Sequence, residues 1–280
     1  MSPTPIADRF TAKVAGGRPL IGAGAGTGLS AKCAEAAAVD FIVIYNAGRY
    51  RMAGRGSMAG MMPYGNANDI VLEMADEILP VVAHTPVLAG ICGTDPFRNI
   101  PRLLQTVKDL GFAGIQNFPT VCLLDGATRD DLEDTGYGFQ KEVDMVALAG
   151  ELGLVTATYV RTDEEAAAMA DAGADVLVAH VGLTSAGMLG AKRAISLDEA
   201  ARRAQRIAEV AHGRRADALV VCHGGPIATP ADALHVFEQA PGVCGFLGAS
   251  SMERIPAERA LVETMSEFVN IPLARAATAG

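Results

Sequence analysis

Short apolar runs recur at regular intervals along the chain and alternate with amphipathic stretches, which predicts strands joined by helices. Most of the runs carry glycine or polar residues at their C-terminal ends. We expect eight strands, at Leu20–Gly24, Phe41–Asn46, Val87–Cys92, Gly114–Phe118, Val155–Val160, Val176–Val181, Ala218–His223 and Gly245–Ser250. Eight strand–helix units in 280 residues are what an α/β protein of the (β/α)8 TIM-barrel class requires.

Cap residues indicate where several of the intervening helices begin. Thr162–Glu165 and Ser196–Glu199 each place a hydroxyl three residues before a glutamate, the pattern of a capping box. Thr229 before Pro230 fits an N-cap followed by a first-turn proline. Asn68 is a candidate cap for the helix before the third strand.

The regular spacing, with no linker, favours a single barrel over residues 1–273, followed by a flexible tail at 274–280. The last helix is expected over Pro256–Phe268. Three segments that follow strands are unusually long for loops: 47–66, 119–138 and 182–194. Because active sites of such barrels lie at the C-terminal ends of the strands, we expect these segments to form lids over one mouth.

Composition argues against several classes of protein. The net charge of −9 disfavours binding to nucleic acid or to an anionic membrane surface, and the chain has no Trp for base stacking. No apolar run is long enough to span a membrane, and the N-terminus has no signal-peptide core. Five cysteines without CxxC spacing predict free thiols and a cytoplasmic protein.

Residues with catalytic chemistry end several predicted strands. His180 and His223 each end a strand, where an imidazole can act as general acid or base. Asn46, Gln116 and Asn117 end the second and fourth strands, where amide groups can hydrogen bond to a reacting carbonyl.

An anionic substrate is indicated by the arginines of an otherwise acidic chain. Arg49 and Arg51 follow the second strand, and a guanidinium can pair with a carboxylate or phosphate through two hydrogen bonds. Small residues after the seventh and eighth strands leave backbone amides free where barrels build anion sites. The remaining candidates for substrate contact are Gly24, Tyr45, Thr184, Gly224, Gly225, Ser250 and Ser251.

Cofactor signals are sparse. The spacing of Gly26, Gly28 and Ala31 is a variant dinucleotide fingerprint, but the second strand ends in Tyr45-Asn46 without the required acid. We therefore expect no nucleotide and no flavin. Asp95 directly follows the third strand and is the candidate ligand for a hard cation such as Mg²⁺.

Longer motifs resemble a known family. They are Asn117-Phe-Pro-Thr120, Leu124-Asp-Gly126, Ala179-His-Val-Gly-Leu-Thr184, His223-Gly-Gly-Pro-Ile227 and Gly245-Phe-Leu-Gly-Ala-Ser-Ser-Met-Glu-Arg254. Together they resemble the phosphoenolpyruvate hydrolase-like family, also called TIM-barrel signal transduction proteins, from about Pro19 to Phe268. The resemblance implies a phosphoenolpyruvate/pyruvate barrel.

Relatives in that superfamily hold a 2-oxoacid enolate on Mg²⁺ with acidic residues at the ends of the third and fourth strands. Here those ends carry Asp95 and Gln116-Asn117. The resemblance also implies a homo-oligomer, since such barrels commonly exchange or pack their last helix. The apolar residues of that helix exceed what one face needs: Ile255, Leu261, Val262, Met265 and Phe268.

These observations favour an enzyme, a C–C or P–C lyase or hydrolase, that acts next to the carbonyl of a small 2-oxoacid-like anion through an enolate. His180 or His223 would be the general acid or base. Two alternatives stay open: a non-catalytic small-molecule sensor or signalling protein, and a phosphate-binding isomerase or flavin-dependent barrel. Sequence does not separate lyase from hydrolase.

Overall fold

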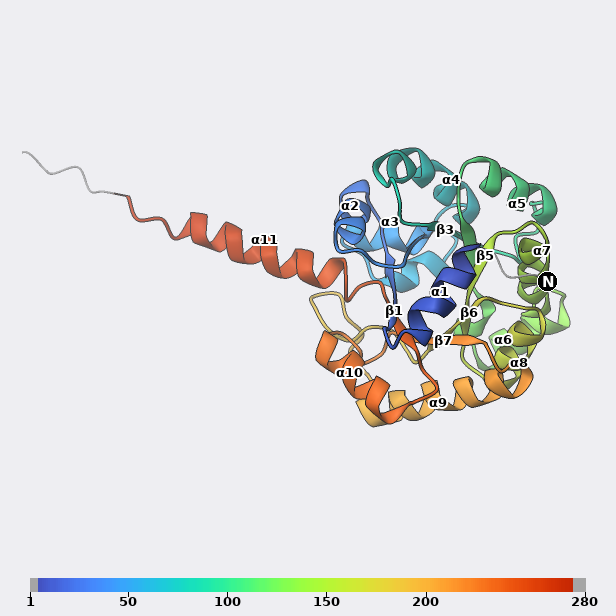
Figure 1. Ribbon diagram of the computed structural model, residues 1–280. Helices are drawn as coiled ribbons and strands as arrows, with labels where there is room; N and C mark the ends of the chain where they lie inside the picture. Colours follow the sequence, from blue (N-terminus) through green and yellow to red (C-terminus); the bar gives the residue numbers. More distant parts are fainter. Residues whose placement is uncertain (1–4, 274–280) are drawn as a thin grey trace, which may run out of the picture.

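Eight parallel strands pair in sequence order and close into a barrel, because β1 also pairs with β8 (Figure 1). The computed structural model describes residues 5–273. The strands are β1 (Leu20–Gly24), β2 (Phe41–Ile44), β3 (Val87–Ile91), β4 (Gly114–Asn117), β5 (Val155–Val160), β6 (Val176–His180), β7 (Leu219–His223) and β8 (Gly245–Gly248). The predicted fold class is confirmed. β2 is two residues shorter than its apolar run because Asn46 already begins a helix.

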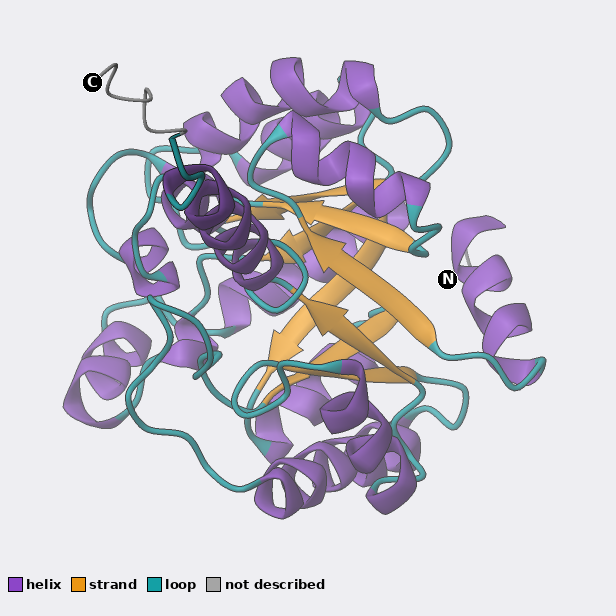
Figure 2. Ribbon diagram, turned by 90° about the vertical axis from the view of Figure 1, so that its left-hand side faces the viewer, coloured by secondary structure: helices purple, strands orange, loops and turns teal. Residues whose placement is uncertain are grey.

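Helices surround the strands (Figure 2). They are α1 (Pro5–Ala15), α2 (Gly28–Ala36), α3 (Asn46–Met52), α4 (Ala67–Ile78), α5 (Ile100–Asp109), α6 (Gly126–Asp134), α7 (Gln140–Glu151), α8 (Asp163–Asp171), α9 (Leu197–Arg214), α10 (Pro230–Gln239) and α11 (Arg254–Val269). Short 3-10 turns are η1 (Ser57–Met61), η2 (Leu79–Val81) and η3 (Val121–Leu123). The predicted flexible tail, 274–280, lies outside the described residues.

Most of the predicted helix caps are confirmed. The hydroxyls of Thr162, Ser196 and Thr229 each accept a backbone N–H in the first turn of α8, α9 and α10. The cap predicted at Asn68 is wrong, because Asn66 caps α4. Asn68 is instead buried inside that helix, where its amide bonds to the backbone after β3.

Two of the three expected long loops contain helices. Segment 47–66 carries most of α3 and all of η1, and segment 119–138 carries η3 and α6, so both loop predictions are wrong. A Cβ on Gly26 would lie 2.1 Å from the Gly48 carbonyl oxygen, which shows that α3 packs directly on the glycine run. Segment 182–194 has no helix or strand, as predicted.

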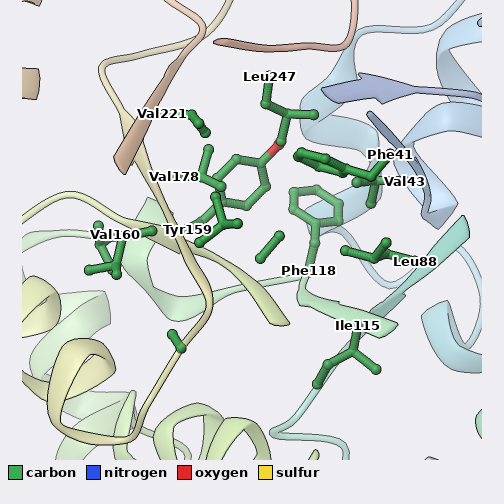
Figure 3. Close-up of a cluster of buried hydrophobic side chains, with 14 of the residues drawn as sticks. Phe41, Val43, Leu88, Ile115, Phe118, Tyr159, Val160, Val178, Val221 and Leu247 are labelled. Carbon is green, nitrogen blue, oxygen red and sulfur yellow. The ribbon is translucent and has the colours of Figure 1, made fainter. Parts of the chain in front are cut away.

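Large rings fill the barrel interior, and glycines lie against them. Figure 3 shows Phe41, Phe118 and Tyr159 among aliphatic side chains from the surrounding strands. A Cβ on Gly22 would lie 2.3 Å from the Phe41 ring, and one on Gly90 would lie 2.4 Å from the Cβ of Tyr45. The interior therefore has room for the rings only because these strand positions carry no side chain.

Helix α1, which the apolar pattern did not reveal, lies at the N-terminal ends of the strands (Figure 2). Its Phe10 is 1% exposed, and the ring centroid lies 5.7 Å from that of Phe41 inside the barrel. The helix therefore covers the end opposite to the predicted site. No helix among residues 5–273 is long and apolar enough to cross a bilayer.

A buried ion pair ties α3 to the start of α11. The Nε of Arg51 lies 2.7 Å from Oε2 of Glu253, and both side chains are almost completely buried. The other carboxylate oxygen accepts the Gly26 N–H and the Ser30 hydroxyl. This single carboxylate therefore joins β8 to the segments that follow β1 and β2.

We expect Glu253→Gln to lower the free energy of unfolding by about 3–5 kcal/mol, because it leaves the buried Arg51 charge without a counter-charge. Urea unfolding followed by circular dichroism measures this. Glu263→Gln, on the exposed part of α11, is the matched control and should change stability by less than about 0.5 kcal/mol. A loss below about 1 kcal/mol for Glu253→Gln would contradict the buried-pair interpretation.

Candidate active site

Five rings meet at the C-terminal end of the barrel: Tyr45, Phe118, Tyr159, His180 and His223. The centroid of the Tyr159 ring lies 5.1 Å from that of His180 and 5.0 Å from that of His223. The two imidazole centroids are 5.0 Å apart. Phe118 lies 6.1 Å from Tyr159 and 4.8 Å from Tyr45. The two predicted histidines therefore converge, and they do so around a tyrosine.

Hydrogen bonds assign the tautomer of His223. Its Nδ1 lies 2.7 Å from the carbonyl oxygen of Leu247, which can only accept, so Nδ1 carries the proton. The lone pair of Nε2 then faces the Tyr159 hydroxyl at 3.3 Å. Burial lowers the pKa of His223 to about 4. At neutral pH this imidazole is therefore an uncharged acceptor for the tyrosine proton.

His180 is held in the opposite tautomer. Its Nδ1 accepts the backbone N–H of Gly182 at 3.3 Å, so the ring proton lies on Nε2. Burial lowers the pKa of His180 well below its usual value, and the charges of His223 and Arg161 lower it further. The site therefore holds a neutral N–H donor next to a neutral nitrogen acceptor.

A small cavity, here called the mouth cavity, adjoins the rings. It is lined by Tyr45, Ala47, Ser57, Met58, Phe118, Leu123, Tyr159, His180, Gly182, Leu183, Thr184, His223, Ala249 and Ser250. Its volume of about 30 Å³ holds roughly one or two water molecules. Residues from all three predicted lid segments line it, so a larger ligand requires those segments to move.

Asn117 and Glu142 hold Tyr159 from outside the barrel. Oδ1 of Asn117 accepts the Tyr159 N–H at 2.7 Å, and Nδ2 donates to the Tyr159 carbonyl at 3.2 Å. Nδ2 also donates to the Glu142 carboxylate, which accepts the Thr120 hydroxyl and the Val121 N–H as well. Burial raises the pKa of Glu142 to about 7. Asn117, expected at the reacting carbonyl, instead fixes the backbone of Tyr159.

Asn46 and Gln116, the other predicted amide groups, do not line the mouth cavity. The Asn46 side chain donates to the Gly60 carbonyl at 2.8 Å and accepts the Ala47 N–H. Gln116 is completely buried, and neither polar atom of its amide has a partner among the described residues. The structure thus brings the histidines together but directs these amides elsewhere.

Arg49 and Arg51 are already paired and do not line the mouth cavity. Nη1 of Arg49 lies 2.7 Å from Oε2 of Glu73 at the surface. Arg51 forms the buried pair with Glu253 described above. Each guanidinium is therefore held by a carboxylate, although Nη1 of the buried Arg51 has no hydrogen-bond partner among the described residues.

The other predicted substrate contacts fall into two groups. Tyr45, Thr184 and Ser250 line the mouth cavity, whereas Gly24, Gly224, Gly225 and Ser251 do not. Gly24 serves packing, because a Cβ there would lie 3.0 Å from the Tyr45 hydroxyl. The N–H of Gly225 donates to the Gly182 carbonyl at 2.7 Å, and a Cβ on Gly224 would lie 2.1 Å from the same oxygen. These glycines tie down segment 182–194.

Asp95 does not fit the metal site that the resemblance implies. Its Oδ2 accepts from Asn66 at 2.8 Å and from Asn68 at 3.0 Å, while Oδ1 accepts the Phe97 N–H. No group of three or more His, Cys, Asp or Glu side chains that could hold a metal occurs within residues 5–273. A hard cation needs several oxygen ligands, and the described donors do not supply them for Mg²⁺.

Tyr159 is the candidate that sequence reasoning missed. It lies in the apolar run of β5, where a single aromatic residue is typical of core packing. The available signal was its position one residue before the C-terminal end of a barrel strand, the same end at which His180 and His223 were found.

A closed parallel barrel with polar side chains gathered at the C-terminal ends of its strands defines a (β/α)8-barrel protein. Within that class the chain belongs to the phosphoenolpyruvate hydrolase-like family, whose model matches residues 5–271. The resemblance found in the sequence is confirmed.

One curated relative is "ToMV resistance protein Tm-1(GCR237)" of Solanum lycopersicum, 52% identical over 270 residues. That match covers 96% of this chain but 36% of the relative, so the chain spans about a third of that protein's length. Solved structures of the same fold include oxaloacetate acetylhydrolase, at TM-score 0.61 and 17% identity over 96% of this chain and 88% of that one.

Another solved structure of the same fold is 2,3-dimethylmalate lyase, a member of the PEP mutase/isocitrate lyase superfamily. It matches at TM-score 0.56 and 18% identity over 100% of this chain and 92% of that one. At these identities the structural likeness establishes the fold.

We expect nitrogen-15 NMR to show His223 as the Nδ1–H tautomer and His180 as the Nε2–H tautomer at pH 7, both uncharged, with His223 staying uncharged down to about pH 5. Because the folded pKa of His223 lies below its ordinary value of 6.5, its contribution to stability falls as pH drops from 6.5 towards 4. A His223 signal that gains charge near pH 6.5 would contradict this.

Proposed function

We propose that the chain is an enzyme, a lyase or hydrolase, that acts next to the carbonyl of a small anionic 2-oxoacid-like substrate through an enolate. The observation that carries the proposal is the hydrogen bond between the Tyr159 hydroxyl and the unprotonated Nε2 of His223, with the N–H donor of His180 beside it. This pair can move a proton, and the donor can stabilise the negative charge that results.

The proton route follows from the tautomers. The substrate loses a proton either from the carbon next to its carbonyl or from a hydroxyl beside the bond that breaks. This proton passes to the Tyr159 oxygen while the tyrosine proton moves to Nε2 of His223. The imidazolium formed keeps its Nδ1–H bond to Leu247, so the ring does not turn. The reverse transfer returns the proton to the product.

The negative charge that develops on the carbonyl oxygen needs a donor that is already in place. Nε2–H of His180 is such a donor, because its other nitrogen is fixed by Gly182. The hydroxyls of Thr184 and Ser250, which line the same cavity, are further donors. No carboxylate is among the described residues that line the mouth cavity, so none opposes the charge of an enolate there at contact distance.

The names of related proteins support the same class. The family is named for phosphoenolpyruvate, and the two structures named above are an oxaloacetate acetylhydrolase and a dimethylmalate lyase. All three names refer to small carboxylic acids. The choice between C–C and P–C bonds stays part of the proposal.

A small-molecule sensor is the second candidate function. It is favoured by the tight packing of the five rings, which leaves only about 30 Å³ in the mouth cavity. A sensor would bind its ligand by opening the lid segments and would not convert it.

The test is deuterium exchange at the carbon next to the carbonyl of pyruvate and 2-oxobutyrate in D2O, followed by proton NMR with and without Mg²⁺. We expect exchange by the wild type and a loss of about 10²–10⁴-fold in Tyr159→Phe and His223→Gln. His235→Gln, which changes a half-buried histidine on α10 away from the rings, is the control and should exchange at the wild-type rate.

Exchange that persists in both site variants would refute the proton route. Ligand-induced thermal stabilisation without exchange would favour the sensor. If these acids show no exchange and give no thermal stabilisation, the proposed substrate class is unsupported.

We also infer that the chain forms a homo-oligomer through α11. The helix leaves the barrel and projects from it in Figure 1, and Figure 2 shows it end-on towards the viewer. Its first residues Arg254 and Ile255 are buried, but Leu261, Met265 and Phe268 are 56–70% exposed. An isolated 16-residue helix is marginally stable in water, so this apolar surface supports packing against a second copy of the chain.

Light scattering at micromolar concentration should give the mass of a dimer or larger assembly for the wild type. The double variant Leu261→Glu/Phe268→Glu should shift the mass towards the monomer, because charged residues on an interface core oppose burial. Leu29→Glu/Phe97→Glu, which changes two even more exposed apolar residues on the barrel, is the matched control. A monomeric wild type would refute the inference.

A further inference from the structure

One side of Tyr159 is held by a side chain instead of a neighbouring strand. The backbone pairing of β4 with β5 ends at Gln116 and Ala157, just before Tyr159. Beyond that point the amide of Asn117 replaces the strand. Its Oδ1 accepts the Tyr159 N–H at 2.7 Å, and its Nδ2 donates to the Tyr159 carbonyl at 3.2 Å. The position of Tyr159 on this side therefore depends on how the Asn117 amide is turned and how firmly it is held.

Glu142, on α7, fixes that orientation. Its Oε2 accepts from Nδ2 of Asn117 and from the Thr120 hydroxyl, each at 2.7 Å, and its Oε1 accepts the Val121 N–H at 2.7 Å. Because only the NH2 end of the amide can donate, the carboxylate turns the oxygen of Asn117 towards the Tyr159 N–H. Glu142 is completely buried, so these protein donors stand where water would otherwise solvate its charge.

The three groups around Glu142 are all donors, which suits an ionised carboxylate. The Thr120 oxygen already accepts the Cys122 N–H at 3.1 Å and Nδ2 of Asn117 at 3.3 Å, so its own proton points to Glu142. A proton on either carboxylate oxygen would face a group that donates to it. Protonation therefore costs at least one of the three bonds, and the bonds that remain lose the charge that strengthens them. The hold on Asn117, and through it on Tyr159, becomes weaker.

We propose that Glu142 is a positioning residue for Tyr159, acting through Asn117, and that proton transfer at Tyr159 proceeds from the state in which Glu142 is ionised. The proposal rests on the proposed function, because Tyr159 is the group that exchanges a proton with the substrate there. It gives a role in the reaction to a carboxylate that does not line the mouth cavity. Protonation of Glu142, here called the Glu142 switch, slows the reaction without a change at the reacting groups themselves.

The surroundings of Glu142 place this switch near neutral pH. Burial raises its pKa to about 7, and the hydrogen bonds it accepts offset only part of that rise. The negative charge of Glu165 on α8 raises the pKa further, although Arg129 pairs with Glu165 at 2.8 Å. The other titratable groups that face Glu142 among the described residues are the thiols of Cys92 and Cys122. Burial raises the pKa of both thiols, so they carry no charge at neutral pH.

The reacting groups do not titrate in the same range. Burial lowers the pKa of His223 to about 4 and that of His180 well below its usual value. Burial raises the pKa of Tyr159 well above its usual value. These three groups therefore keep one protonation state between about pH 6 and 8, and a step in the rate within that range points to Glu142.

Stability and rate should respond to Glu142 in opposite directions. Because its folded pKa of about 7 lies above its ordinary value of 4.5, this carboxyl contributes stability that is present below pH 4.5 and is lost as pH rises through about 7. The same rise in pH strengthens the bonds to Asn117 and should raise the rate. A carboxyl with a merely structural role would move stability and rate together.

Deuterium exchange of pyruvate by the full chain, measured against pH after subtraction of the uncatalysed rate, tests the proposal. The wild-type rate should rise about tenfold from about pH 6 to 8, because the ionised fraction of a group with a pKa of about 7 changes by that factor. Glu142→Gln keeps the shape of the side chain but offers a single acceptor atom. It should abolish the step and slow exchange at the upper end of the range at least about tenfold.

Asp175→Asn is the matched control. Asp175 is another partly buried carboxylate that holds β5, at the opposite end of the strand. Its Oδ2 accepts the Thr156 N–H at 2.9 Å and the Thr156 hydroxyl at 3.1 Å, and burial raises its pKa as well. The control should keep the wild-type pH profile within about twofold. A step that persists in Glu142→Gln, or that is lost equally in Asp175→Asn, overturns the proposal.

Backbone NMR of Tyr159 follows the same switch without substrate. The chain has five tyrosines, so selective nitrogen-15 labelling of tyrosine gives five backbone signals, and the signal lost in Tyr159→Phe is that of Tyr159. In the wild type this signal should shift with a midpoint near pH 7, because its N–H donates to Asn117. It should not shift in Glu142→Gln. A wild-type Tyr159 signal that stays fixed from about pH 6 to 8 overturns the proposal, and this measurement requires no variant of Glu142 to fold.

Failure of the Glu142 switch and failure of the proposed function are distinguishable. If exchange depends on Tyr159 and His223 but has the same pH profile in Glu142→Gln as in the wild type, the function stands and the switch fails. If the Tyr159 signal titrates through Glu142 but no exchange occurs, the positioning stands and the enzyme proposal fails.

Discussion

Closing eight strands into one barrel fixes the width of the interior, so every large side chain that points inward needs a small one against it. The rings of Phe41 and Tyr45 fit because Gly22, Gly24 and Gly90 carry no side chain. The same closure brings neighbouring strand ends to one place. Tyr159 and His180 therefore meet through geometry that no single strand specifies.

Burial in that closed interior decides the chemistry of the site. In water the two histidines would be interchangeable groups that titrate near pH 6.5. Inside the barrel, the Leu247 carbonyl makes one an Nδ1–H tautomer and the Gly182 N–H makes the other an Nε2–H tautomer. A donor and an acceptor thus lie side by side without net charge, which suits proton transfer next to a carbonyl.

Buried charged side chains hold neighbouring segments of the barrel together. Arg51 is used inside the protein, where it joins α3 to Glu253 and keeps the segments after β1, β2 and β8 together. Glu142 is likewise used to hold Asn117 against β5. The guanidinium of Arg51 also lies 5.7 Å from the centroid of the Tyr45 ring, so one buried positive charge adjoins the ring cluster.

The sequence by itself determined the eight strands, most helix caps and the position of both histidines, because apolar periodicity and hydroxyl caps act over a few residues. It also identified the family through its longer motifs. It did not reveal that Arg49 and Arg51 are paired, that Asn117 turns away from the mouth, or that Tyr159 joins His223. Those facts depend on partners 24 to 202 residues away along the chain, which only closure of the barrel brings into contact.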